Sequence, residues 1–165
     1  MTYDEYIDRS LAALSRYALM LTTDRHTAAD LVQETMVRAR ERWQRVASAD
    51  SPEAYVRRML TNLYLDWHRG PWLRRVWLRA DPVETAAPHD HAQRSAERDE
   101  VWQTLSTLPR QQRAALVLRF YEDRPHQEIA EILGCSVGAV RGYISKALAT
   151  LRARATADVP TGGSR

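Results

Sequence analysis

The sequence is poor in residues that support disulfide-bonded, thiolate-metal or membrane-spanning structure. Its 165 residues include one cysteine, Cys135, so the chain forms no internal disulfide and no cysteine-based metal site. A lone thiol fits a reducing cytoplasm. No apolar run approaches the roughly 20 residues that span a bilayer, and the start MTYDEYIDRS lacks the apolar core of a secretory signal. We therefore expect a cytoplasmic protein without membrane insertion.

Glycine and phenylalanine are also scarce, with six copies and one copy, whereas Ala, Leu and Arg are abundant. This mix favours helices over strands. The sequence offers no nucleophile–base pair, glycine-rich phosphate loop or metal-ligand cluster, and the His-Asp-His run at 89–91 lacks the helical spacing of a ligand pair. We therefore expect a protein that is not an enzyme and that uses no cofactor and no metal.

The charge is unevenly distributed along the chain, although the net charge is only +3. Residues 51–80 carry a net charge of +4 and residues 124–165 carry +3, whereas residues 81–123 carry −3. Two basic segments on either side of an acidic one suit two separate contacts with a polyanion. The same pattern fits solvated helix faces, so charge alone leaves both interpretations open.

Apolar residues at three- and four-residue steps predict three helices in the first part of the chain, over residues 3–21, 24–43 and 52–69. Thr23 or Asp24 caps the second helix and Ser51 caps the third, while RVASADSPE forms a break between them. Three helices of this length make a compact bundle. The predicted core positions are Tyr6, Leu11, Leu14, Tyr17, Ala18, Leu21, Ala28, Leu31, Val32, Thr35, Met36, Ala39, Tyr55, Met59, Leu63 and Trp67.

The middle of the chain is predicted to be a linker, because it contains prolines and little apolar periodicity. A second helical block follows, and its helix over RQQRAALVLRFYED has Ala115, Leu116, Leu118 and Phe120 as core candidates. The fold class that we expect is all-α, with two small helical domains joined by a flexible linker. The expected division is a first domain at 1–70, a linker at 71–97, a second domain at 98–155 and a disordered tail at 156–165.

The stretch EIAEILGCSVGAVRGYI, residues 128–144, has the features of a helix-turn-helix. Ala130 permits close helix approach, Gly134 suits a left-handed helix end, and Ser136 caps the second helix. Arg141 has the fork geometry that pairs with guanine. A packed helical hairpin that binds no DNA is the alternative that this motif alone leaves open. The outward face of the second helix comprises Val137, Gly138, Arg141, Gly142, Ser145 and Lys146.

Three segments together resemble regions 2 and 4 of bacterial RNA polymerase sigma factors. They are DRHTAADLVQETMVRARERW, SPEAYVRRMLTNLYLDWHR and LSTLPRQQRAALVLRFYEDRPHQEIAEILGCSVGAVRGYISKALATLR. The similarity is greatest to the compact extracytoplasmic-function (ECF) group, in its SigE-like actinobacterial branch, and covers nearly the whole chain apart from the linker and tail. The resemblance implies a three-helix-bundle-type region 2 and a helix-turn-helix region 4.

The resemblance also implies a factor that binds core RNA polymerase and directs initiation at specific promoters. Its partners would be core polymerase, contacted through the clamp helices of the largest subunit, promoter DNA, and an anti-sigma factor, which this family often has. The polymerase-binding residues that it implies are Asp30, Gln33, Glu34, Val37 and Arg38.

Two DNA-binding surfaces are implied in the same way. Arg57, Arg58, Asn62 and Arg69 would bind the melted minus-ten element, and the loop ASADSP matches the family position of a pocket for a flipped base. The minus-thirty-five element would be bound as duplex. The residues implied for that contact are Ser136, Val137, Gly138, Arg141, Gly142, Ser145 and Lys146.

The chain departs from the family pattern in two places that bear on DNA binding. Arg124-Pro125-His126 stands where the family has a capping Ser or Thr, so another group is expected to cap that helix. Arg141-Gly142-Tyr143 stands where a more basic run is usual, so the preferred promoter sequence does not transfer. A stand-alone helix-turn-helix regulator, and a helical protein that binds polymerase or a sigma factor without DNA, are the alternative functions.

Overall fold

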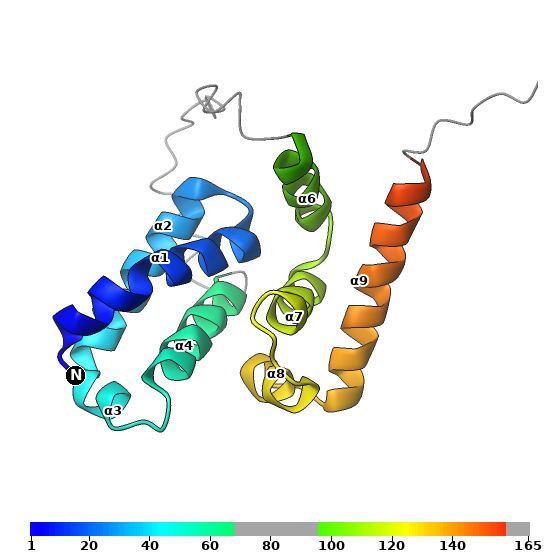
Figure 1. The fold of residues 1–165 in the computed structure, drawn as a ribbon. Coiled ribbons are helices and arrows are strands. Elements are labelled where there is room, and N and C mark those ends of the chain that lie inside the picture. Colours follow the sequence, from blue (N-terminus) through cyan, green and yellow to red (C-terminus); the bar gives the residue numbers. More distant parts are fainter. Residues whose placement is uncertain (68–95, 158–165) are drawn as a thin grey trace, which may run out of the picture. The chain divides into compact units, whose positions relative to one another are not determined.

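Every regular element in the described residues, 1–67 and 96–157, is an α-helix in the computed structural model of the protein (Figure 1). The chain divides into two compact units between Trp102 and Gln103. The helices are α1 (Tyr3–Thr22), α2 (Arg25–Glu41), α3 (Trp43–Ala47), α4 (Pro52–Asp66), α6 (Ala96–Ser106), α7 (Arg110–Phe120), α8 (His126–Leu133) and α9 (Val137–Ala157).

The first unit is a bundle in which α1, α2 and α4 pack on one another, with α3 against α2 and α4. Asp24 caps α2 by accepting a hydrogen bond from the Thr27 amide at 2.9 Å, while Thr23 ends α1 in the left-handed region at φ 57°. Of the two caps that the sequence allowed, Asp24 is therefore the correct one. Ser51 caps α4 by accepting from the Ala54 amide at 3.2 Å, as expected.

A buried hydrogen bond joins α1 to α4 inside this core. The Tyr17 and Thr61 hydroxyl oxygens lie 2.7 Å apart, and the Thr61 hydroxyl donates to the Arg57 carbonyl at 2.8 Å. Thr61 therefore accepts from Tyr17, because its single proton is already used. The pair satisfies two hydroxyls that would be costly to bury unpaired.

Several sequence predictions need correction. Tyr55 and Met59 on α4, predicted as core, are only partly buried. Leu11 is exposed because Ser10, one residue earlier, occupies the core face of α1. Phe120 is 62 % exposed, since two residues rotate a helix by about 200° and place it opposite the buried Leu118. The expected break after Trp43 begins with the short helix α3, because the Trp43 ring packs on Tyr3 with ring centroids 5.6 Å apart.

The second unit is centred on α7, which packs on both α8 and α9. Residues 113–118 are all buried, so this helix has no solvated face over that span. Arg113 is only 8 % exposed, and its guanidinium donates to the carbonyls of Leu108 at 3.0 Å and Ser106 at 3.3 Å. It thereby fixes the end of α6 to the start of α7. The last helix, α9, continues to Ala157, two residues beyond the expected end of the domain.

Candidate nucleic-acid interface

The corner between α8 and α9 has the geometry of a helix-turn-helix. Gly134 ends α8 in the left-handed region at φ 65°, and the Cys135 amide donates back to the Ala130 carbonyl at 3.0 Å. The Ser136 hydroxyl accepts from the Ala139 amide at 3.0 Å and so caps α9. Ala130 is buried at the contact. The small residues singled out in the sequence therefore occupy the positions that the tight corner requires.

The expected outward face of α9 is accessible. Arg141, Ser145 and Lys146 are exposed, whereas Val140 and Ile144 are buried on the opposite face. Within the described residues, Arg141 and Lys146 make no ion pair. Their charges are therefore available to an external anion, which for a second helix of this motif is duplex DNA. Val137 and Gly142 are partly buried, and Gly138 is exposed.

Gly142 is a mid-helix glycine that packing does not require. A Cβ added there would have no atom within 4 Å, and the backbone is helical. We expect Gly142→Ala to raise the free energy of unfolding by about 0.5–1 kcal/mol, because alanine is the better helix former. Urea denaturation followed by circular dichroism measures this gain. A lower free energy of unfolding would show that the space beside Gly142 is occupied in solution.

The same substitution is expected to weaken duplex binding, because the methyl group would hold the α9 backbone away from the groove. Ala149→Leu is the matched control. Ala149 is exposed on the same side of α9, about 10 Å further along the axis, beyond the turns that reach base edges. In gel-shift titrations on one promoter duplex, Gly142→Ala should therefore bind more weakly than Ala149→Leu.

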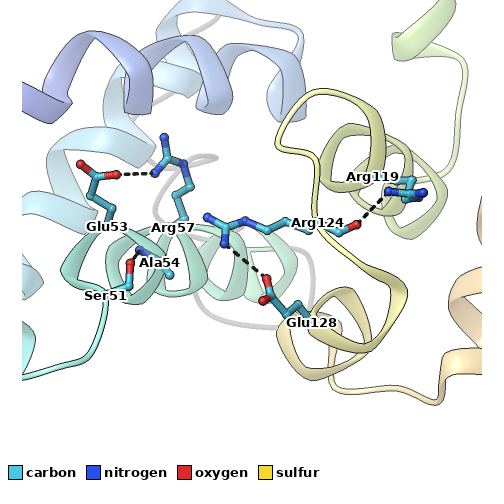
Figure 2. A network of polar contacts seen from close by, with 7 residues as sticks. All are labelled: Ser51, Glu53, Ala54, Arg57, Arg119, Arg124 and Glu128. Carbon is cyan, nitrogen blue, oxygen red and sulfur yellow. Dashed lines mark hydrogen bonds and ion pairs between the residues drawn. The ribbon is translucent and has the colours of Figure 1, made fainter.

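The start of α8 lacks the side-chain cap that was expected from another group. No side chain accepts a hydrogen bond from its first turn in the described residues. Instead Glu128 lies in that turn, 3.3 Å from the Arg124 guanidinium (Figure 2). A carboxylate in the first turn offsets the positive end of the helix dipole. The start of α8, which lacks the capping Ser or Thr of the family, is therefore stabilised by charge rather than by a side-chain cap.

Cys135 lies in the turn and is partly buried. Burial raises the pKa of its thiol above the usual value. The thiol is therefore largely protonated near neutral pH and is a poor nucleophile. This environment agrees with a packing position better than with a redox-active one.

The residues of α4 that were expected to bind the minus-ten element differ in their exposure. Arg58 and Asn62 are exposed, in line with the expected outward face. Arg57 is partly buried and lies 3.8 Å from the Glu53 carboxylate (Figure 2). Its charge is thus already partly balanced within the unit. Arg69 lies outside the described residues.

The expected polymerase-binding residues on α2 do not all lie beside the same hollow. Gln33 and Val37 are exposed beside a hollow of about 580 Å³, which Tyr3 and Arg40 also line. The Tyr3 hydroxyl donates to the Met36 carbonyl at 3.0 Å, and the Arg40 guanidinium lies over the Tyr3 ring. The structure therefore adds Tyr3 and Arg40 to this surface. Sequence spacing could not find Tyr3, because it belongs to another helix.

Arg38 lies beside a different hollow, which it shares with α4. Its guanidinium is 2.9 Å from the Glu34 carboxylate, one turn earlier on the same helix. Asp30 is exposed on the same helix, one turn before Glu34. The five residues form one arc of α2, with Gln33 and Val37 at one border and Arg38 at the border with α4.

Other chemistries find no support in the described residues. No cluster of three or more His, Cys, Asp or Glu that could hold a metal ion occurs among them. None of the helices in that part of the chain is long and apolar enough to cross a membrane. The expected functional surfaces that lie within the described residues are those on α2, α4 and α9.

The fold and the corner between α8 and α9 define a helix-turn-helix protein with a second, bundle-type helical unit. Residues 6–76 match the family Sigma-70 region 2, and residues 98–151 match Sigma-70, region 4. The chain belongs to the sigma-70 family of RNA polymerase sigma factors, in its ECF group. It is a sigma factor, which binds core RNA polymerase and promoter DNA and directs promoter-specific initiation. A stand-alone regulator is not favoured.

Individual proteins agree with this assignment. The chain is 33 % identical to the RNA polymerase sigma-E factor of Streptomyces avermitilis over 152 residues, covering 92 % of this chain and 84 % of that one. It is 31 % identical to the ECF RNA polymerase sigma factor SigE of Mycolicibacterium smegmatis, over 92 % of this chain and 60 % of that one. The structure of the sigma factor RpoE in complex with the anti-sigma factor NepR from Bartonella quintana has the same fold. Its TM-score is 0.73 and its identity 24 %, covering 94 % of this chain and 98 % of that chain.

Proposed function

We propose that this sigma factor recognises its promoter through two separate DNA contacts and binds core polymerase through a third surface. In this proposal α9 enters the major groove of the minus-thirty-five element. The exposed Arg141 and Lys146, opposite the buried Val140 and Ile144, are the observation that carries it. Arg141 reads a guanine edge and Lys146 contacts phosphate. Ser136, Val137, Gly138, Gly142 and Ser145 complete the contact surface.

The exposed side of α4 is proposed to bind the melted minus-ten element, with Arg58 and Asn62 as the contacts that the described residues offer. Single strands are held by cations along the backbone together with aromatic or apolar platforms for the bases. Arg57 contributes by fixing the helix surface through Glu53 rather than as an exposed cation. Two weak contacts on one chain strengthen each other through effective concentration.

The α2 surface of Asp30, Gln33, Glu34, Val37 and Arg38, extended by Tyr3 and Arg40, is proposed to dock on the clamp helices of the largest polymerase subunit. An exposed valine among hydrogen-bonding and charged side chains suits a coiled coil, which presents apolar ridges between charged rows. The protein supplies no chemistry of its own in this proposal, because polymerase carries the reaction. It acts where polymerase and the chromosome are, in the cytoplasm.

An anti-sigma factor is proposed as a further partner. The Bartonella quintana protein, which shares this fold, was solved with its anti-sigma factor. A protein that covers the α2 or α9 surface would keep this chain from polymerase or from promoters.

The test of the proposed function is run-off transcription with core polymerase and a promoter library. Specific initiation that requires this chain is the expected result. Tight footprinting by the chain alone, with no initiation on adding polymerase, would overturn it.

Arg141→Ala is expected to relax specificity at one base pair of the upstream element and to cost about 1–3 kcal/mol of binding free energy. Lys146→Ala is the comparison on the same helix face. It is expected to weaken binding to all sequences equally, because phosphate contacts carry no sequence information. Gel-shift titrations of both variants on duplexes that differ at each upstream position distinguish the two effects. Equal losses on every duplex for Arg141→Ala would contradict base reading by this residue.

A further inference from the structure

Lysine is almost absent from this chain, and the position of the single copy is informative. The 24 Lys and Arg side chains comprise 23 arginines and one lysine, Lys146. Lys146 is exposed on α9, on the face that carries Arg141 and that is proposed to contact duplex DNA. A need for positive charge does not by itself select lysine there. Arginine binds phosphate as well and is used at all of the other 23 positions.

Lysine differs from arginine in carrying an amine that can lose its charge. A guanidinium keeps its proton in proteins and is not a target for acylation. An ε-amine that takes up an acyl group becomes a neutral amide. The chain therefore has one side chain at which acylation removes a positive charge, and that side chain lies at the proposed upstream DNA contact.

The surroundings of Lys146 leave its amine accessible to a small molecule. Gly142, one turn earlier, has no side chain, and a Cβ added there would meet no atom within 4 Å. The Thr150 hydroxyl, one turn later, donates to the Lys146 carbonyl at 3.1 Å and so bonds the backbone rather than the amine. Ala149 is small and exposed, and Tyr143 is partly buried. No bulky exposed side chain therefore stands one turn away from Lys146 along α9.

The charge of α9 favours the approach of anions. The helix contains four cations, Arg141, Lys146, Arg152 and Arg154, and no Asp or Glu. Within the described residues Lys146 makes no ion pair. Groups of like charge raise the local concentration of oppositely charged ligands. Acyl phosphates and the acyl thioesters of coenzyme A are anionic, so the field that attracts DNA phosphates also attracts these acyl donors.

We propose that Lys146 is a site of regulatory acylation, at which an acyl phosphate or an acyl thioester modifies the amine and weakens binding to the minus-thirty-five element. The neutral amine attacks the acyl carbon and forms a C–N bond. The C–O bond to phosphate, or the C–S bond to the thiol, breaks, and phosphate or thiolate leaves with the bonding electron pair. The amine proton passes to water. The inference rests on the proposed contact between α9 and the upstream element.

Acylation changes DNA binding because the modified side chain no longer neutralises a phosphate. Each phosphate contact contributes about 0.9 to the slope of log affinity against log salt concentration on B-DNA. We expect acetylation of Lys146 to weaken binding about 5- to 10-fold at about 0.1 M salt and to reduce that slope by about one. The loss should be equal on all upstream sequences, since phosphate contacts carry no sequence information.

The experiment treats the full-length chain with acetyl phosphate or with acetyl coenzyme A, in separate samples that each contain a reference peptide with one lysine. Peptide mass spectrometry should find an acetyl group on Lys146 in at least one sample, and the sample identifies the donor class. Ion-exchange chromatography isolates the acetylated chain, because it has lost one positive charge. Holoenzyme is then formed with untreated core polymerase. Its affinity for a labelled upstream duplex is measured by fluorescence anisotropy at several salt concentrations.

Lys146→Arg is the matched control, because it keeps a cation and removes the amine. Each protein is compared with its own untreated sample, so the control does not require arginine to bind DNA as lysine does. Treatment should leave the affinity and the salt slope of Lys146→Arg unchanged, which also covers any effect of acetylating the α-amino group. Lys146→Gln carries a neutral amide. Without treatment it should reproduce the lower affinity and the lower slope of the acetylated wild type.

Either of two results would overturn the proposal. One is that Lys146 remains unmodified in both samples although the reference peptide is acetylated. The other is that Lys146 is acetylated but affinity and salt slope stay as in the untreated chain.

Failure of this inference is distinguishable from failure of the proposed function. If untreated holoenzyme initiates at promoters and acetylation of Lys146 does not change its binding, only the inference is wrong. If untreated holoenzyme does not initiate, the proposed function is wrong, and the mass spectrum still reports whether Lys146 is acylated.

Discussion

Val37→Asp is expected to abolish stable binding to core polymerase, with an affinity loss of at least about 100-fold, or roughly 3 kcal/mol. Val37 is 52 % exposed on α2, next to Gln33. At the proposed docking surface this side chain becomes buried on binding. A carboxylate in its place would lose its hydration without gaining a matched partner. The loss should appear in titrations of labelled protein with core polymerase, and run-off transcription should fall in parallel.

Val101→Asp is the matched control for this experiment. Val101 is 53 % exposed on α6, so the same substitution is made at the same exposure on a helix that carries none of the proposed docking residues. Both variants should fold as the wild type does, because neither valine is buried, and circular dichroism checks this. Polymerase affinity within about twofold of the wild type for Val37→Asp would remove α2 from the docking surface.

Arg113→Ala is expected to lower the free energy of unfolding of the second unit by about 2–4 kcal/mol. The guanidinium of this largely buried residue donates to the carbonyl of Ser106 at the end of α6 and to that of Leu108 in the turn that follows. Hydrogen bonds from a charged donor are about twice as strong as neutral ones. Alanine removes both bonds and leaves a cavity beside α7, and the buried Leu108 carbonyl and the partly buried Ser106 carbonyl lose their donor. Hydrogen exchange of the α7 and α9 amides, followed by mass spectrometry, reports the loss.

Arg119→Ala is the control on the same helix. The Arg119 side chain is 37 % exposed and lies 3.8 Å from the Asp123 carboxylate. Exposed ion pairs contribute about 0–1 kcal/mol, so exchange in this variant should change little. If the two variants destabilise the unit equally, the Leu108 and Ser106 hydrogen bonds are not what stabilises it.

Local signals in the sequence predicted the fold well. Ser51 and Ser136 were predicted as helix caps, and Asp24 was one of two candidates for a third cap. Each of the three accepts the hydrogen bond that a cap requires. Gly134 adopts the left-handed conformation that was expected of it. These predictions succeed because caps and turns depend on a few residues in sequence, so no knowledge of packing partners is needed.

Predictions that depend on packing were less complete. Periodicity assigned Tyr55 to the core, but which flank of α4 is covered depends on where α2 ends. The helix α3 was missed because it is supported by Trp43 packing on Tyr3 and Tyr6, 37 or more residues away in sequence. Tyr3 carries no local signal for function. It became a candidate because the structure places it at a hollow shared by α1 and α2.

The contact between Arg113 and the end of α6 has a consequence for the conditions under which the second unit holds together. A guanidinium does not lose its proton in proteins, and backbone carbonyls do not titrate. The interaction is also buried, so dissolved ions screen it little. The second unit is therefore joined at this point by groups that respond neither to acidity nor to salt. The ion pairs of α2 and α4, Glu34–Arg38 and Glu53–Arg57, lie nearer the surface, where dissolved ions screen them more.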